Sequence, residues 1–272
     1  RVPIKISHIL SHQKYENTLR FRTKELESLN EHFKKVPNIK TKDVINFWLS
    51  NAEYCDIRKN LNADFKPVFI YHLTSILYYM SCMYKEYGLT APKTIVFSGN
   101  GSKYIDNFIC ADKRVLKKII NLIFNEVFGG DHDVNLELPK ERKEATCYGG
   151  LFRDADAEDV PEKVYQGDIK NNYETVGHIE KNFAELKRAL LGKYEELSSL
   201  YEKVLHLLKK ENIIDNTADT NKYVSVSEEN MGTLLSTYYK TQVKEKYSDE
   251  VIMNDSVFFL PIINRILEMT KL

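Results

Sequence analysis

The segment with the clearest chemical potential runs from Ile95 to Ser102 and reads Ile-Val-Phe-Ser-Gly-Asn-Gly-Ser. It follows a β-rich run and precedes a stretch with helical periodicity. Gly99 and Gly101 allow the backbone to approach a ligand closely and to adopt dihedral angles that other residues avoid. The N-terminus of the next helix would add free N–H groups and positive potential, which suits a phosphate or a sugar. A tight turn without any ligand also needs glycine, so both interpretations stay open.

The other reactive side chains do not form a catalytic set. His8 and His12 are four residues apart without a third ligand, and we interpret them as a chance pair on a solvated face. His132 is interpreted as part of a solvated turn, and His72, on an apolar helical face, as a packed core histidine. The cysteines lack a C-x-x-C pair and are interpreted as buried thiols in a reducing compartment: Cys55, Cys82, Cys110 and Cys147. We therefore predict no catalytic residue and no metal site.

The elements around the glycine-rich turn follow from periodicity and from stop signals. Apolar residues at helical spacing predict a helix over 64–87, capped by Asp64, with Pro67 in its first turn. The run 94–97 has no polar alternation, which predicts a strand buried on both faces of a parallel sheet.

After the turn, the pattern predicts a helix over 104–127 that ends before Gly129, a strand over 134–138 and a short helix over 144–148. The order helix, strand, helix, strand, helix is typical of a βαβ arrangement.

Beyond an acidic linker at 154–159, the sequence predicts an all-helical region. A stripe of apolar residues predicts one long helix over 176–207, ended by the polar residues at 212–217. Two shorter helices are expected, one from Ser227 to Lys246 and one from Asp255 to Met269, each capped by its first residue. Pro261 would lie inside the last helix, where it is costly unless it kinks the helix. The long stripe has two interpretations, packing within the chain or a seam for a protein partner.

Two motifs resemble the ATPase superfamily of actin, the heat-shock chaperones and the sugar kinases. Ile95–Lys103 is similar to the adenosine motif of that superfamily, and Lys143–Leu151, which reads Lys-Glu-Ala-Thr-Cys-Tyr-Gly-Gly-Leu, resembles its closing helix. The resemblance covers about residues 64–152. It implies a mixed, helix-rich α/β fold: a partial actin-like (ribonuclease H-like) domain with a short parallel sheet and a helical C-terminal extension. In this chain Asn100 separates two glycines that are adjacent in the family.

The resemblance implies that the chain binds ATP or ADP with Mg²⁺ on the adenosine side of a cleft. The residues that it assigns to the nucleotide are Ser98, Gly99, Asn100, Gly101, Ser102 and Lys103. The phosphate loops of the family contain Asp-x-Gly, and that tripeptide does not occur in this sequence. We therefore expect the C-terminal part of an ATPase that hydrolyses ATP only together with an upstream domain. The alternative is a non-enzymatic helical interaction module whose glycine turn is purely structural.

Composition narrows the possible partners. The sequence of 272 residues has 39 basic and 39 acidic residues, and this balance argues against a nucleic-acid partner. No apolar run is long enough for a membrane span and no signal peptide is present, so we expect a cytoplasmic protein. The chain opens with Arg1, and we interpret it as a piece of a longer protein. We expect a helical N-terminal segment or subdomain insertion (1–63), the actin-like part (64–152) and the helical extension (153–272), with a protein partner bound through helices 176–210 and 255–269.

Overall fold

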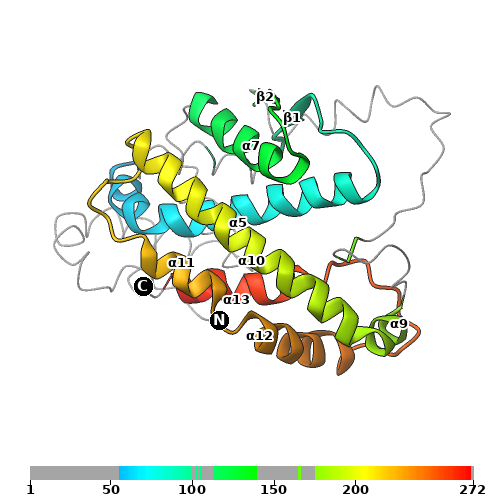
Figure 1. Cartoon of the computed structure of the whole chain (residues 1–272). Helices are drawn as coiled ribbons and strands as arrows, with labels where there is room; N and C mark the ends of the chain where they lie inside the picture. Colours follow the sequence, from blue (N-terminus) through cyan, green and yellow to red (C-terminus); the bar gives the residue numbers. More distant parts are fainter. Residues whose placement is uncertain are drawn as a thin grey trace, which may run out of the picture. The chain divides into compact units, whose positions relative to one another are not determined.

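The computed structural model describes residues 55–99, 102, 105, 113–139, 165–166 and 175–270, with side chains from residue 66 onward (Figure 1). The chain divides into two compact units, 1–63 and 64–272. The described part of the second unit is helix-rich and contains a small parallel sheet, which confirms a mixed α/β fold. The N-terminal segment up to residue 54, the predicted helix at 144–148 and the acidic linker at 154–159 lie outside the described residues.

Helix α5 spans Cys55–Glu86, so it begins before the predicted start. Asp64 therefore lies inside the helix and does not cap it, and Pro67 is an interior proline. The predicted C-terminal end is confirmed: Gly88 has a φ of +69°, and the Leu89 N–H donates to the Tyr84 carbonyl at 2.8 Å, which closes the last turn.

His72 is exposed, so its prediction as a core histidine is wrong. The apolar face of α5 is wide, but His72 and Ile76, one turn apart, lie on the narrow strip of the helix that faces away from the core. Residues on either side of that strip, such as Tyr71 and Leu77, are buried.

Strands β1 (Thr94–Val96) and β2 (Asn135–Glu137) pair in parallel, with Ile95 opposite Leu136. The predicted parallel pairing is confirmed. The prediction that the strand at 94–97 is buried on both of its faces is wrong. Ile95 and Leu136 pack against the core, while the alternate residue Val96 is 54% exposed. The sheet of the described region has two strands and one covered face, which explains this alternation.

Helix α7 (Lys113–Phe128) connects the two strands. It ends at Gly129 and Gly130, with φ values of +75° and +90°, as the glycine pair predicts. The predicted start at Tyr104 lies outside the described residues. Asn121 and Asn125 on α7 accept the backbone N–H groups of Val134 and His132, which holds the loop between α7 and β2 against the helix.

The long helix predicted over 176–207 is two helices, α9 (Val176–Lys181) and α10 (Phe183–Lys210). Asn182 separates them, and its side-chain amide donates to the His178 carbonyl at 3.0 Å. Asparagine competes in this way with the helical hydrogen bonds, which explains the break. The predicted end is confirmed, because Asn212 adopts a φ of +56° just beyond α10.

The last helices are α11 (Asn221–Glu228), α12 (Met231–Tyr238), the π-helical segment η4 (Tyr239–Lys244) and α13 (Phe259–Met269). Ser227 is not a cap: it lies buried within α11, and its hydroxyl shares a hydrogen bond of 2.7 Å with that of Ser198. The break falls instead at Asn230, with a φ of +52°.

Asp255 is not a cap either, because α13 begins at Phe259. Pro261 consequently falls in the first turn of the helix, where a missing N–H breaks no helical hydrogen bond.

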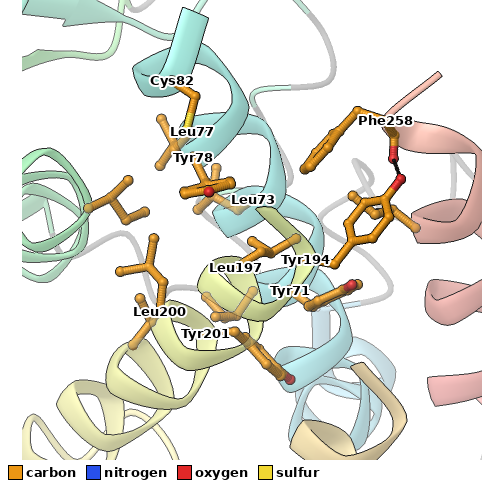
Figure 2. Close-up of a cluster of buried hydrophobic side chains, with 14 of the residues drawn as sticks. Tyr71, Leu73, Leu77, Tyr78, Cys82, Tyr194, Leu197, Leu200, Tyr201 and Phe258 are labelled. Atoms are coloured by element: carbon orange, nitrogen blue, oxygen red, sulfur yellow. Dashed lines mark hydrogen bonds between the residues drawn. The ribbon is translucent and has the colours of Figure 1, made fainter. Parts of the chain in front are cut away.

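In the described part of the second unit, a hydrophobic core joins α10 to the other helices. Its buried residues include those of the predicted stripe: Val176, Ile179, Leu186, Leu190, Tyr194, Leu197, Leu200 and Val204. Figure 2 shows Tyr71 of α5 beside Tyr201 of α10, with ring centroids 5.1 Å apart. The Tyr201 hydroxyl donates to the Pro67 carbonyl at 2.9 Å. The stripe is therefore used for packing within the chain, and the C-terminal helices share their core with α5 and α7.

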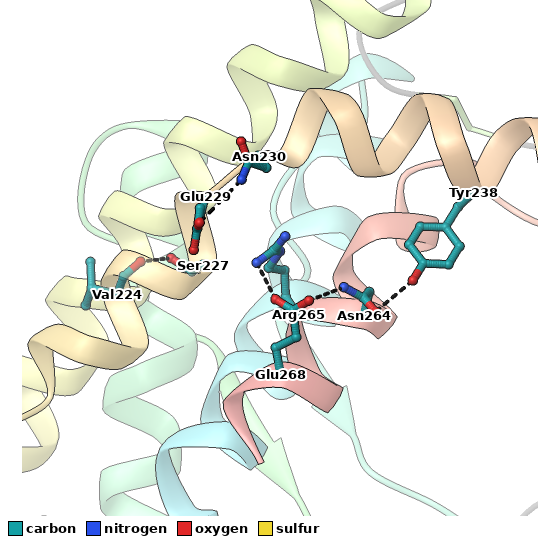
Figure 3. Close-up of polar contacts among 8 residues, drawn as sticks. All are labelled: Val224, Ser227, Glu229, Asn230, Tyr238, Asn264, Arg265 and Glu268. Carbon is teal, nitrogen blue, oxygen red and sulfur yellow. Dashed lines mark hydrogen bonds and ion pairs between the residues drawn. The ribbon is translucent and has the colours of Figure 1, made fainter. Parts of the chain in front are cut away.

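A polar network connects α12 to α13 (Figure 3). The Tyr238 hydroxyl donates to Asn264 Oδ1 at 2.7 Å, and Asn264 Nδ2 donates to Glu268 Oε1 at 2.8 Å. Arg265 is buried and donates from Nη1 to Glu268 Oε2 at 2.5 Å. Among the described residues, Glu268 supplies the carboxylate that pairs with this buried guanidinium.

Candidate functional site

The turn after β1 carries the residues that the sequence singles out. Pairing of the strands continues one residue past β1, because the Phe97 N–H donates to the Glu137 carbonyl at 3.0 Å. Gly99 then adopts a φ of +78°, in the left-handed region that favours glycine. The Ser102 N–H and hydroxyl both donate to the Gly99 carbonyl, at 3.2 and 2.7 Å. The turn is therefore closed by Ser102 and requires glycine at position 99.

Three of the six predicted nucleotide-binding residues can be placed. Ser98 is exposed, Gly99 is half-buried and Ser102 is buried. Asn100, Gly101 and Lys103 lie outside the described residues. A Cβ atom added to Gly99 would meet nothing within 4 Å, so the space next to its Cα is open. Open space at a glycine permits the close backbone approach on which the predicted binding depends.

The turn lies at the carboxyl end of β1, and α7 connects β1 to the parallel strand β2. In open α/β sheets ligands bind in crevices outside the carboxyl ends of parallel strands. The helix N-terminus that the sequence predicts directly after the turn is outside the described part of the chain, and α7 itself begins at Lys113.

A concave site, which we call the three-helix pocket, lies between α5, α7 and α10. It has a volume of about 430 Å³. Tyr78 and Cys82, one turn apart on the same face of α5, belong to its wall (Figure 2). The Tyr78 hydroxyl donates to Glu196 Oε2 of α10 at 2.5 Å. Burial raises the pKa of Tyr78 well above its usual value, and the neighbouring Cys82 and Glu196 raise it further. Tyr78 therefore serves as a neutral hydrogen-bond donor in this pocket.

The three-helix pocket combines residues that no single pattern in the sequence connects. Its α5 wall has a local signal, since Tyr78, Cys82 and Glu86 recur every four residues and share one face of the helix. The α10 wall carries lysines and glutamates that are typical of a solvated helix face. Only the packing of α10 across α5 and α7 brings the two sets together.

Two further pockets flank the C-terminal half of α10. One, of about 710 Å³, lies between α7 and α10, and the other, of about 560 Å³, lies between α10 and α11. Lysines line both. Ion pairs hold two lysines of the first pocket, Lys118 with Glu211 and Lys203 with Glu126, each at 2.7 Å. Part of the positive charge of that pocket is therefore neutralised within the chain.

The described residues contain no group of three or more histidine, cysteine or acidic side chains arranged to hold a metal ion. Cys82 is a buried thiol. Within the same part of the chain, no helix combines the length and the apolar character needed to cross a bilayer.

No protein-family model, no curated protein and no solved structure matches this chain.

Proposed function

We propose that the chain binds ATP or ADP with Mg²⁺ through the turn at 98–103, as the C-terminal part of an actin-like or chaperone-like ATPase. The observation that carries the proposal is Gly99: it has a φ of +78°, open space beside its Cα and a position at the carboxyl end of a parallel strand. A nucleotide phosphate or sugar approaches such a turn without meeting a side chain. The resemblance of Ile95–Lys103 to the adenosine motif of the superfamily supports the same assignment.

In this proposal the chain contributes binding and not hydrolysis. No Asp-x-Gly loop is present in the sequence to hold Mg²⁺ and the phosphates, and no described residue is placed as a general base. Residues of another segment would complete the cleft, and closure around the nucleotide would then report its state to a partner.

Calorimetric titration with Mg-ATP and Mg-ADP tests the proposal, with a matched pair of variants. Gly99→Asp places a negative side chain beside the bound phosphates. Gly88→Asp introduces the same side chain at another glycine with positive φ, +69°, and with nothing within 4 Å of its Cβ position. Both variants bear a similar backbone strain, of about 1 kcal/mol.

We expect saturable binding by the wild type and by Gly88→Asp, and at least about tenfold weaker binding by Gly99→Asp. Equal binding by all three proteins would place the nucleotide elsewhere. If the folded wild type binds neither nucleotide, the turn is purely structural.

The second candidate is a helical interaction module. The specific observation in its favour is on α13, where Ile263 and Leu267, one turn apart, are 57% and 56% exposed. The apolar stripe of α10 is buried within the chain and offers no partner surface. The titration separates the candidates, because an interaction module without a nucleotide site gives no binding heat with either nucleotide.

A further inference from the structure

The pocket between α10 and α11, which we call the α10–α11 pocket, has a volume of about 560 Å³, within the range of protein pockets that hold small molecules. Its α10 wall carries charged or titratable side chains: Glu202, His206, Lys209 and Lys210. The loop after α10 and the start of α11 add uncharged polar side chains: Asn216, Thr220 and Asn221. Two lysines against one glutamate make the fixed charge of this lining positive.

The two lysines of the α10–α11 pocket keep donors available for a ligand. Lys210 is exposed in the last turn of α10, and its side chain forms no ion pair or hydrogen bond with another described residue. Lys209 Nζ donates to the Ala218 carbonyl at 2.8 Å, and an ammonium group has two further hydrogens to donate. In the pocket between α7 and α10, by contrast, ion pairs hold Lys118 and Lys203.

Thr220 has a hydroxyl that the described part of the chain leaves without a partner. Only 8% of the residue is exposed, yet its side chain does not cap α11 and makes no hydrogen bond with another described residue. The hydroxyls of Tyr71 and Thr74 are unpaired and sealed from solvent, whereas the Thr220 oxygen keeps accessible surface in the pocket that the residue lines. An unmade hydrogen bond in a mostly buried group costs free energy, which an acceptor in the pocket would recover.

Two acids of the loop beside this pocket are engaged with the loop itself. Asp215 accepts from the Thr217 N–H and hydroxyl at 2.8 and 2.7 Å, and Asp219 accepts from the Asn221 N–H at 3.0 Å. Neither acid lines the pocket. Because these bonds shape the loop, this wall of the pocket is organised before a ligand arrives. Asp219 already occupies the first N–H of α11, so the site relies on side chains and not on the helix terminus.

We propose that the α10–α11 pocket binds a small phosphate ester of a sugar or polyol. The phosphate oxygens accept hydrogen bonds from Lys209, Lys210 and the Thr220 hydroxyl. A phosphate group has three acceptor oxygens and up to two negative charges, so it can use all of these donors at once. This site is separate from the turn at 98–103 and does not depend on the nucleotide proposal.

The same lining orients the ligand. Glu202, His206 and Lys210 recur every four residues on one face of α10, so the backbone positions of Glu202 and Lys210 lie about 12 Å apart along the helix. A carboxylate repels a phosphate but accepts hydrogen bonds from hydroxyl groups. The phosphate therefore lies at the Lys210 end, and the hydroxyl groups of the organic part point towards Glu202. His206, between the two ends, can donate to or accept from the ligand.

Calorimetric titration of the full chain tests the ligand class. The esters are D-glucose 6-phosphate and glycerol 3-phosphate. Among the comparison probes, D-glucose lacks the phosphate, D-glucuronate carries a carboxylate in its place, and inorganic phosphate lacks the organic part. We expect saturable binding of at least one ester, and binding of each comparison probe that is weaker by about tenfold or more.

Each other outcome overturns a stated part of the proposal. Equal binding of glucose or glucuronate overturns the assignment of a phosphate group. Equal binding of inorganic phosphate overturns the assignment of a sugar or polyol. The absence of binding by both esters at millimolar concentration overturns the site as a whole.

Three variants and a control locate the site. Thr220→Val replaces the unpaired hydroxyl with a methyl group, so it should weaken ester binding about fivefold to tenfold without lowering the midpoint of urea unfolding. Lys210→Gln removes one ammonium group and should weaken binding about tenfold. Asn216→Trp fills the pocket from an exposed position in the loop and should abolish saturable binding. Arg188→Gln removes a positive charge from an exposed position on α10 that does not line the pocket, so it should keep the wild-type affinity.

The location is overturned by unchanged affinity in Lys210→Gln and Asn216→Trp, even if Thr220→Val fails to fold. It is also overturned if Arg188→Gln weakens binding as much as Lys210→Gln does, because the esters would then respond to the overall charge of α10 and not to this pocket.

Discussion

Three glycines of the helical region provide a graded test of the packing. Adding a Cβ atom at Gly192, on α10, meets nothing within 4 Å. At Gly232, on α12, the added atom lies 3.2 Å from Leu191 Cδ2 and 3.3 Å from Lys187 Cε, the outer atoms of flexible side chains. At Gly177, on α9, it lies 3.1 Å from the Cβ and 3.2 Å from the carbonyl oxygen of Asp249.

The neighbour of Gly177 cannot easily retreat. The Gly177 N–H donates to the Asp249 carbonyl at 2.9 Å, and the Val176 N–H donates to the Val251 carbonyl at 3.0 Å. An antiparallel bridge between Thr175 and Ile252 continues this contact. Moving the backbone at residue 249 away from a new methyl group would lengthen these hydrogen bonds, so the crowding becomes a loss of stability.

These contacts predict how the three alanine variants rank in stability. Glycine to alanine in a helix with open surroundings stabilises by about 0.5–1 kcal/mol, which we expect for Gly192→Ala. Overpacking against a rigid neighbour costs about 1–3 kcal/mol, so Gly177→Ala should lose about 1–2 kcal/mol after its helical gain. In Gly232→Ala the two effects offset each other, and we expect stability within about 0.5 kcal/mol of the wild type.

Urea unfolding followed by far-ultraviolet circular dichroism measures the three differences. The gap between Gly192→Ala and Gly177→Ala should be about 2 kcal/mol, or roughly 4–8 °C in melting temperature for a unit of this size. A Gly177→Ala protein as stable as Gly192→Ala would show that α9 does not pack against residue 249. Unequal urea m-values would indicate a changed unfolded state and not a changed contact.

Burial raises the pKa values of Tyr79 and Tyr239 to about 12, so the folded state holds their protons more tightly than the unfolded state. Stability should be complete below pH 10 and fall as the pH rises towards 12, with tyrosinate absorbance appearing together with the loss of circular dichroism. Glu268→Ala leaves the buried Arg265 without its carboxylate, so the free energy of unfolding measured in urea should fall by about 2 kcal/mol. Adding Arg265→Met to this variant removes the buried charge and should recover most of the lost stability. Leu197→Ala empties a fully buried position on α10 and should cost about 2–5 kcal/mol by the same method; a loss below 1 kcal/mol would contradict the packing in Figure 2.

Elements with a local stop signal could be predicted from the sequence. The glycine pair after α7 requires positive φ values that end a helix whatever surrounds it. Pro139 lies just beyond β2, and Gly88 lies at the end of α5. Each of these residues restricts its own backbone, so the signal does not depend on tertiary contacts.

Helix starts were predicted less well, because a polar residue that can cap a helix can also lie within one. Asp64 lies in the interior of α5, and Ser227 is buried in α11 with the Ser198 hydroxyl as its partner. The hydrogen-bond partner of Ser227 lies on another helix, α10, and no local sequence pattern reveals it. The break at Asn182 is hidden in the sequence for a related reason: the apolar spacing continues across this residue, while its side chain ends the hydrogen bonding of α9.

The two candidate sites differ in the same way. Gly99 could be identified from the sequence because its turn needs a backbone conformation that glycine supplies. The three-helix pocket could not, because its charged side chains are typical of solvated helix faces. Glu126 and Glu196 of this pocket pair with Lys203 and Lys193 of α10. Only the packing of α10 across α5 and α7 brings these side chains together, so the pocket is a property of the tertiary structure.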